Sequence, residues 1–110
     1  MSVALIVLEP KNEKYSRMYI PIATEELYED VWQKGAQALN AEWLPLFQSG
    51  VALTVEDFGA VTRELLAFEQ WLKTAPIDPE LRAFVSGRVN LLLKNLTSLA
   101  EDKEVKVFIG

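Results

Sequence analysis

The sequence predicts an α+β fold in which helices cover one face of a small sheet. The prediction rests on two strand-like runs near the N-terminus, three helix-like apolar patterns, and an alternating run at the C-terminus. We expect one domain over residues 1–110, with a three-stranded, mostly antiparallel sheet and its first strand in the centre. The expected strands lie near residues 3–8, 17–22 and 104–109, and the main helices near residues 25–39, 55–73 and 79–100.

The first two strands are predicted from their apolar residues. Residues 3–8 form a continuous β-prone apolar run, which is typical of a central strand that is buried on both faces. Residues 17–22 alternate instead, with Ile20 and Ile22 on one face. Pro21 has no N–H to donate to a strand ladder, so we expect this second strand at an edge of the sheet.

The first helix is predicted by its start signal and its periodicity. Thr24 is a good N-cap, and Glu25 and Glu26 follow in the first turn, where the helix dipole favours anions. From there to about residue 39, apolar residues fill one half of the helical wheel and polar residues fill the other.

The two long helices also carry clear start signals. Thr54 is an N-cap with Asp57 at the third helical position, and Leu53 and Phe58 are spaced as a hydrophobic staple. Asp78-Pro79 starts the last helix, with Pro at its first position. The closing run, residues 104–109, alternates and predicts a final strand with its valines and isoleucine facing inward.

Residues 40–50 have a mixed pattern. Pro45 separates Trp43-Leu44 from Leu46-Phe47, which predicts a short helical turn or loop before Gly50. In one interpretation, its large side chains fill the open end of the helix layer. In the other, they form an apolar surface patch surrounded by acidic residues. Trp and Phe are enriched at interface hot spots, so Trp43 and Phe47 are candidate partner-binding residues.

The composition excludes most catalytic chemistry. The chain has no Cys and no His, which rules out thiol catalysis, disulfides, zinc fingers, His-based triads and most transition-metal sites. It has no glycine-rich phosphate-binding motif either. We therefore expect no enzyme activity and no cofactor, although Mg²⁺ or Ca²⁺ binding by carboxylates remains open.

The charge is acidic and uneven. The formal net charge is −5, whereas a general nucleic-acid-binding protein is basic, so we expect no nucleic-acid partner. Residues 24–57 hold seven acids and one base. A partner attracted by charge is expected to be basic and to meet this segment, with Glu25, Glu29, Asp30 and Glu42 as candidate contacts.

The apolar run at the start does not resemble a targeting segment. It is six residues long, lacks a preceding basic region, and is ended by Glu9-Pro10. Such a run is too short for a signal-peptide core or a membrane span. We expect a soluble, cytoplasmic protein with no membrane partner.

The acids at the start of the first helix resemble part of a known metal motif. Glu25-Glu26-x-x-Glu29 is similar to the E-E-x-x-E half of the motif in all-α nucleotide pyrophosphohydrolases. Those enzymes need a second E-x-x-D pair, and none occurs between Asp30 and Asp57. We therefore interpret these acids as a helix start and a solvated helix face, and we predict no metal site.

Two further features of the predicted helices can be interpreted from the sequence. Glu64 and Arg88 flank the apolar stripes of their helices and are expected to form an ion pair across the helix pair; alternatively, Arg88 lines an anion pocket. Gly35, Gly59 and Gly87 lie inside helices, where Gly is unfavourable, so we expect close helix approach at these positions.

Three functional hypotheses follow. The first is a protein-binding protein, of the kind that inhibits or confers immunity against a basic protein. The second is a small-molecule or carboxylate-metal binding protein with a pocket between the sheet and the helices. The third is a structural subunit of an assembly. We also expect a homodimer, because Leu66 and Trp71 lie off the core stripe of their helix and the segment around Trp43 is apolar.

Overall fold

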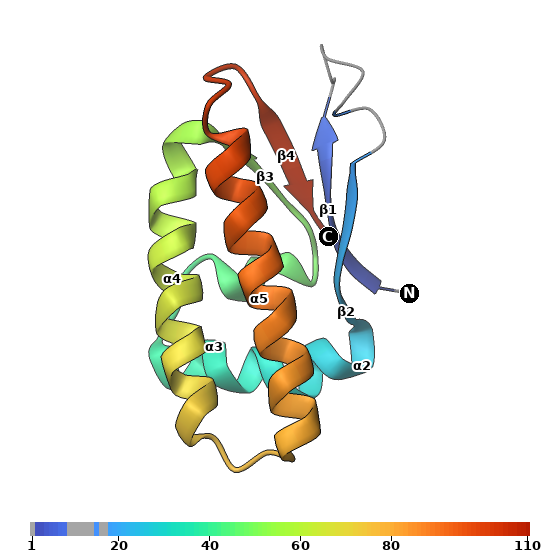
Figure 1. Cartoon of the computed structure of the whole chain (residues 1–110), viewed down its shortest axis with the longest axis vertical. Coiled ribbons are helices and arrows are strands. Elements are labelled where there is room, and N and C mark those ends of the chain that lie inside the picture. The colour runs from blue at the N-terminus through green and yellow to red at the C-terminus, as the bar shows by residue number, and fades with distance from the viewer. Residues whose placement is uncertain (1, 9–14, 16–17) are drawn as a thin grey trace.

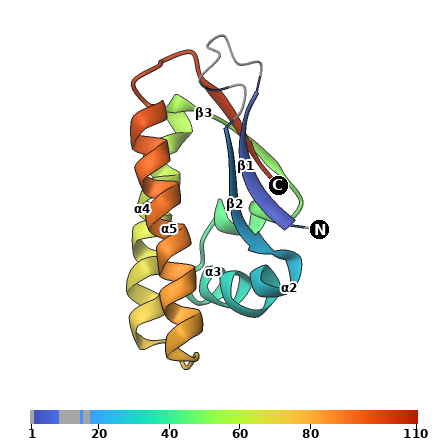
Figure 2. The same cartoon turned by 45° about the vertical axis from the view of Figure 1, so that its right-hand side comes forward.

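A computed structural model, which describes residues 2–8, 15 and 18–110, places a sheet on one side of a long helical hairpin (Figure 1, Figure 2). The predicted α+β class and the three main helical segments are confirmed. The elements, in chain order, are β1 (Ser2–Leu8), β2 (Tyr19–Thr24), α2 (Glu25–Leu27), the π-helical turn η1 (Tyr28–Trp32), α3 (Gln33–Leu39), the 3-10 helix η2 (Leu44–Phe47), β3 (Val51–Thr54), α4 (Val55–Thr74), α5 (Pro79–Leu99) and β4 (Lys106–Ile109).

Over the residues that the structure describes, the sheet has four antiparallel strands in the order β2-β1-β4-β3, so the predicted count of three is wrong. The missed strand, β3, has four residues and pairs with β4 at the edge. The predicted positions of β1 in the interior and of β2 at an edge are confirmed. The first and last strands pair with each other, with Leu5 opposite Ile109.

The two faces of β1 differ in exposure. Val3, Leu5 and Val7 point toward the helices and are buried, whereas Ile6 is 36% exposed on the opposite face. The expectation that β1 is buried on both faces is therefore wrong. Helices cover only one face of the sheet, as Figure 2 shows.

The helix caps predicted at Thr24 and Thr54 are formed, whereas the Asp78 side chain makes no capping hydrogen bond at the start of α5. The Thr24 hydroxyl accepts a hydrogen bond from the Leu27 N–H at 3.1 Å. The Thr54 N–H donates to the Asp57 carboxylate at 3.0 Å, and both residues of the predicted staple are buried. Pro79 begins α5, as expected.

The first helical segment is continuous but contains a π turn, which its periodicity did not predict. Tyr28 and Trp32, at the two ends of η1, are both fully buried. Their rings belong to a stacked series that continues through Phe68 to Trp71 on α4, with 4.6 Å between the ring centroids of Trp32 and Phe68. This aromatic series joins the first helical segment to the hairpin.

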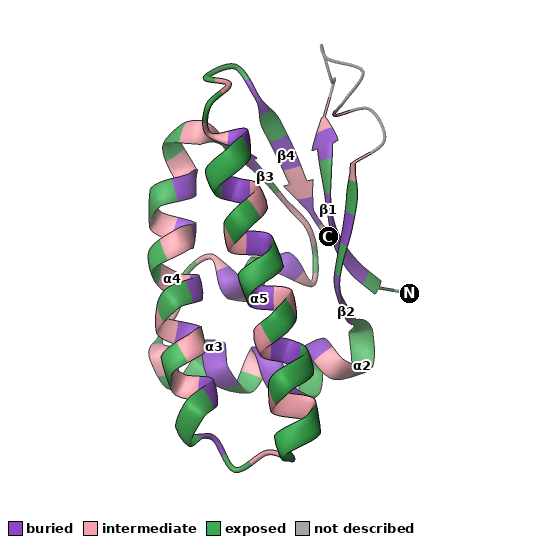
Figure 3. Ribbon diagram, viewed as in Figure 1, coloured by how far each residue is buried: buried purple, intermediate pink, exposed green. Residues whose placement is uncertain are grey.

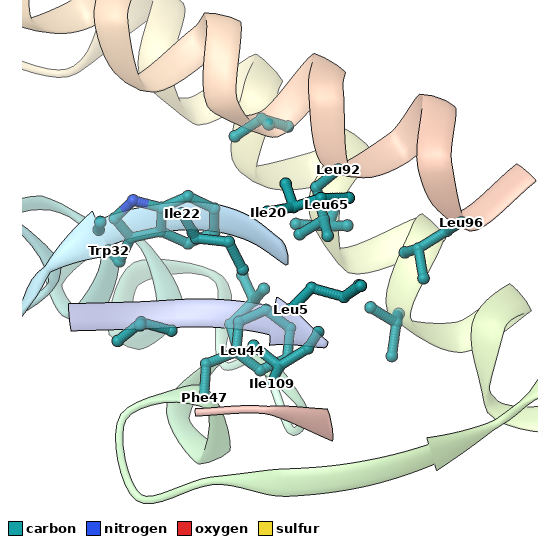
Figure 4. Close-up of a cluster of buried hydrophobic side chains, with 14 of the residues drawn as sticks. Leu5, Ile20, Ile22, Trp32, Leu44, Phe47, Leu65, Leu92, Leu96 and Ile109 are labelled. Carbon is teal, nitrogen blue, oxygen red and sulfur yellow. The ribbon is translucent and has the colours of Figure 1, made fainter. Parts of the chain in front are cut away.

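The α4–α5 hairpin is longer than the sheet and is covered by two different units. The sheet packs along the half of the hairpin that holds the start of α4, and the segment from α2 to α3 crosses the other half (Figure 1, Figure 2). Figure 4 shows Leu5, Ile20 and Ile109 of the sheet gathered opposite Leu92 and Leu96 of α5. The core therefore lies between the sheet and the hairpin.

Close helix approach occurs at one of the three helical glycines. A Cβ on Gly35 would lie 2.9 Å from the Trp71 ring, so only glycine fits there. Gly59 and Gly87 are exposed, and a Cβ on either would meet no atom within 4 Å. The close-approach prediction is correct for Gly35 and wrong for Gly59 and Gly87.

The exposed residues of α4 and α5 follow their outer sides, away from the sheet (Figure 3). In the described part of the chain, none of the helices combines the length and the apolar character that crossing a bilayer requires.

Candidate protein-binding surface

The segment at residues 43–47 is not an exposed apolar patch. Leu44 and Phe47 are fully buried, and Figure 4 shows Phe47 beside Leu44 in the core. Trp43 is half-buried, while Leu46 is 42% exposed. Phe47 is therefore a core residue, which corrects its assignment as a partner-binding anchor: the segment plugs the helix layer.

The Glu64 carboxylate holds this segment in place. It accepts hydrogen bonds from three consecutive backbone N–H groups, those of Glu42 at 3.0 Å, Trp43 at 2.9 Å and Leu44 at 3.1 Å. These groups precede or begin η2 and have no partner within it, so an anion is favoured there. This contact could not be predicted from the sequence, because backbone donors leave no residue pattern.

A buried tyrosine adds a second link. The Tyr28 hydroxyl donates a hydrogen bond to the Leu44 carbonyl oxygen. Burial raises the pKa of Tyr28 well above its usual value, so the phenol is neutral across the physiological range. The segment is thus tied to α4 by Glu64 and to η1 by Tyr28.

The predicted Glu64–Arg88 ion pair is not formed. Glu64 is turned toward residues 42–44, whereas the Arg88 guanidinium donates to the Pro21 carbonyl oxygen at 3.4 Å and lies 5.2 Å from the centroid of the Phe84 ring. The two side chains face different neighbours because α4 approaches η2 while α5 approaches β2. Arg88 borders a mainly apolar cavity of about 210 Å³.

A further polar cluster lies between α4 and α5, and the sequence reasoning missed it. The Ser86 hydroxyl donates to one Glu69 carboxylate oxygen at 2.5 Å, and Arg82 donates to the Ala75 carbonyl oxygen at 2.8 Å. Within the described chain, the other Glu69 oxygen and the Arg82 Nε are buried without partners. Both residues line a cavity of about 260 Å³, which has room for water to satisfy them.

The predicted acidic contacts are all at the surface. Glu25, Glu29, Asp30 and Glu42 are exposed, and the Glu29 carboxylate accepts a hydrogen bond from the Gln48 side chain at 2.8 Å. Trp43, by contrast, lines a cavity of about 300 Å³ between the end of α3 and α4. Among residues 2–8, 15 and 18–110, no three acids are grouped as metal ligands would be.

The uncovered face of the sheet is apolar. We call it the outer sheet face. Tyr19, Ile6, Phe108 and Ala52 are paired in one row across all four strands. Tyr19 is 59% exposed and Ile6 is 36% exposed. The residues of the outer sheet face are Ser2, Ala4, Ile6, Leu8, Tyr19, Pro21, Thr24, Ala52, Thr54, Lys106 and Phe108. Ala4 is buried, and the polar residues lie toward the two ends of the strands.

Phe108 lies over two glycines on this face. A Cβ on Gly50 or Gly110 would clash with the Phe108 ring, at 2.5 Å and 2.7 Å respectively, and Gly50 has a φ of 104°. An aromatic ring laid over a glycine restores packing where the strand has no side chain. The Phe108 ring therefore packs against the backbone of Gly50 and Gly110.

Two features hinder strand pairing at the edge of β2. Pro21 has no N–H, and its carbonyl oxygen is occupied by Arg88. A structural subunit could assemble by adding a strand at this edge, but the Arg88 contact and the proline both act against that route.

Comparisons with protein-family models, with curated protein sequences and with solved structures found no match to this chain. Any function of this chain therefore has to be inferred from its own geometry.

Proposed function

We propose that this protein works by binding another protein chain through the outer sheet face and that it is not an enzyme. The observation that carries the proposal is the row of apolar side chains at Tyr19, Ile6 and Phe108 on an uncovered sheet. An antiparallel sheet with one solvated face normally alternates apolar and polar residues. A contiguous exposed apolar patch is typical of an interaction site.

The amino-acid types at the centre of the patch also support the proposal. Tyr and Phe are enriched at interface cores, and Tyr19 presents a large rigid ring with most of its surface exposed. The non-catalytic part of the proposal is supported by the composition, since the chain holds no Cys and no His.

Site-specific photo-crosslinking tests this proposal. Benzoylphenylalanine in place of Tyr19 is expected to form a covalent adduct with a protein in the cells that make this chain. The matched control carries the same group in place of Leu66, which is 51% exposed on α4 and lies outside the outer sheet face. Adducts of equal yield at both positions, or at neither, would contradict the proposal.

The acidic surface favours a second candidate, in which the partner is a basic protein that this chain inhibits, as an immunity protein does. The support is the exposure of Glu29 and Asp30 on η1, in a segment with only one base. Charge complementarity acts mainly on the association rate. Glu29→Lys with Asp30→Lys is expected to slow association with the crosslinked partner, and added salt is expected to mask the effect.

A further inference from the structure

We propose that the cavity beside Arg88 binds a small organic monocarboxylate, whose carboxylate pairs with the Arg88 guanidinium while its short hydrocarbon chain lies against the apolar walls. This is the cavity of about 210 Å³ where the end of β2 and the start of α2 face α5. It shares Pro21 with the outer sheet face but requires no partner there, so the inference goes beyond the proposed function.

The walls of the cavity are mainly apolar, and part of them belongs to the core. Ile22 and Ala23 are buried and Leu27 is half-buried, whereas Phe84 is 49% exposed. A hydrocarbon group in the cavity covers part of the exposed Phe84 ring, which is favourable because it removes apolar surface from water. Ligand sites are typically apolar cavities in which a few polar groups fix the orientation of the ligand.

The charge of the cavity comes from Arg88, which is the single charged residue among the described residues that line it. The guanidinium is always protonated, and no acid stands three or four residues from it along α5, where an ion pair within the helix could form. Within the described chain, its partners are the Pro21 carbonyl oxygen and the Phe84 ring. Neither partner carries a negative charge, so an anion has a favourable position here.

The Arg88 guanidinium also keeps donors for a carboxylate. Its hydrogen bond to the Pro21 carbonyl oxygen uses Nη1 alone, and its length of 3.4 Å exceeds the usual value of about 2.9 Å. Among the described residues, its other N–H groups have no partner. A carboxylate accepts two parallel N–H groups of a guanidinium, which is a stronger contact than a single bond to a neutral carbonyl oxygen.

Nearby acids limit the charge of the ligand. Glu25 and Glu26 follow Thr24, which lines the cavity, and both are exposed outside the lining. Their carboxylates repel additional negative charge at this end of β2. A ligand with one negative charge is therefore favoured over phosphate or a dicarboxylate.

The volume of the cavity limits the size of the ligand. About 210 Å³ is less than the roughly 300–1,000 Å³ of pockets that hold drug-sized ligands. A short-chain acid such as hexanoate is therefore the suitable probe. A ligand of this size is expected to bind with a dissociation constant of roughly 1 mM.

Amide NMR spectra recorded during a titration with hexanoate test the inference. Saturable shifts are expected at the backbone N–H groups of Ala23 and Leu27 and at the Arg88 Nε–H. Hexanol keeps the chain without the charge, and acetate keeps the charge without the chain, so each is expected to bind about tenfold more weakly or worse. Succinate is also expected to bind more weakly than hexanoate, because it carries a second charge.

Two outcomes of the titration would overturn the inference. The first is the absence of saturable shifts at hexanoate concentrations well above the expected dissociation constant, or shifts confined to residues away from the cavity. The second is equal affinity for hexanoate and hexanol, which would show that Arg88 takes no part in binding.

Variants identify the cavity as the site. Arg88→Gln is expected to raise the dissociation constant for hexanoate by about tenfold or more. Lys94→Gln removes the same charge from an exposed position of α5 and is the matched control, with no expected effect on binding. Ser2→Phe changes an exposed residue of the lining, fills the cavity while Arg88 stays in place, and is expected to weaken binding as well.

Thermal melts show which variants are folded. Binding that survives Arg88→Gln or Ser2→Phe in a folded protein, or that is lost with Lys94→Gln, would overturn the inference.

Discussion

The two faces of the sheet are built from similar residues but have different surroundings. On the inner face, Leu5 is fully buried against the helices, whereas one residue later Ile6 is 36% exposed on the outer sheet face. The apolar residues of β1 therefore lie on both faces of the sheet, and the helices of the chain cover only one of these faces. An apolar strand indicates that both of its faces favour contact with other groups, and the tertiary fold decides which face the chain covers by itself.

Substitutions on the two faces of β1 give the largest expected contrast. Leu5→Ala is expected to lower the free energy of unfolding by about 2–5 kcal/mol, because it opens a cavity in the core. Ile6→Thr is expected to cost about 1 kcal/mol or less in the monomer, because Ile6 faces solvent. Urea unfolding measures both; equal losses would contradict the distinction between the faces.

The stability of the core on the inner face also depends on η2, whose Leu44 and Phe47 are buried there. Glu64→Gln is expected to lower the free energy of unfolding by about 1.5–3 kcal/mol, because charged acceptors of backbone N–H groups are strong partners. Arg63→Gln, one residue earlier at an exposed position, is the matched control and is expected to have little effect. If both variants melted at the wild-type temperature, the Glu64 contacts would contribute nothing to stability.

Two helical glycines show a similar contrast, because Gly35 is buried and Gly87 is exposed. Gly35→Ala is expected to destabilise the fold by about 1–3 kcal/mol, because the added methyl group meets Trp71 and Phe68. Gly87→Ala is expected to stabilise it by about 0.5–1 kcal/mol, because its position is open and alanine favours helix. Thermal melts of the two variants should shift in opposite directions, and a shift in the same direction would refute the contrast.

Tyr28 gives the smallest effect, and only at alkaline pH. Its pKa is raised in the folded chain, so the unfolded chain loses the phenol proton first, near pH 10. The contribution of Tyr28 to stability is therefore fully present well below pH 10 and falls as the pH rises above it, by roughly 1 kcal/mol at pH 11. Unfolding of wild type and Tyr28→Phe at pH 8 and pH 11 measures it. A difference between them that does not change with pH would contradict burial of the phenol.

Regular elements with long patterns were predicted well from the sequence. The caps at Thr24 and Thr54 and the proline at the start of α5 mark helix starts within one or two residues, because capping is a local interaction. The edge position of β2 followed from Pro21, because a missing N–H is a property of the residue itself.

Short and non-local features were predicted poorly. The four residues of β3 are too few to show alternation, and Leu53 also serves the staple that indicates the next helix. The π turn at residues 28–32 keeps apolar residues on one side, so its pattern does not differ from that of an α-helix. The partner of Glu64 was wrongly assigned because opposite charges are visible in a sequence and backbone N–H groups are not.

The sequence by itself determined the α+β class, the starts of the helices, the central position of β1 and the acidic charge of residues 24–57. These depend on periodicity, caps and counts, which act over a few residues. Only the tertiary structure decided that Phe47 is core, that Glu64 and Arg88 have separate partners, and that one apolar face of the sheet is uncovered. Burial depends on which elements meet in space, and the packing of the α4–α5 hairpin against a single face leaves the outer sheet face as the surface to test.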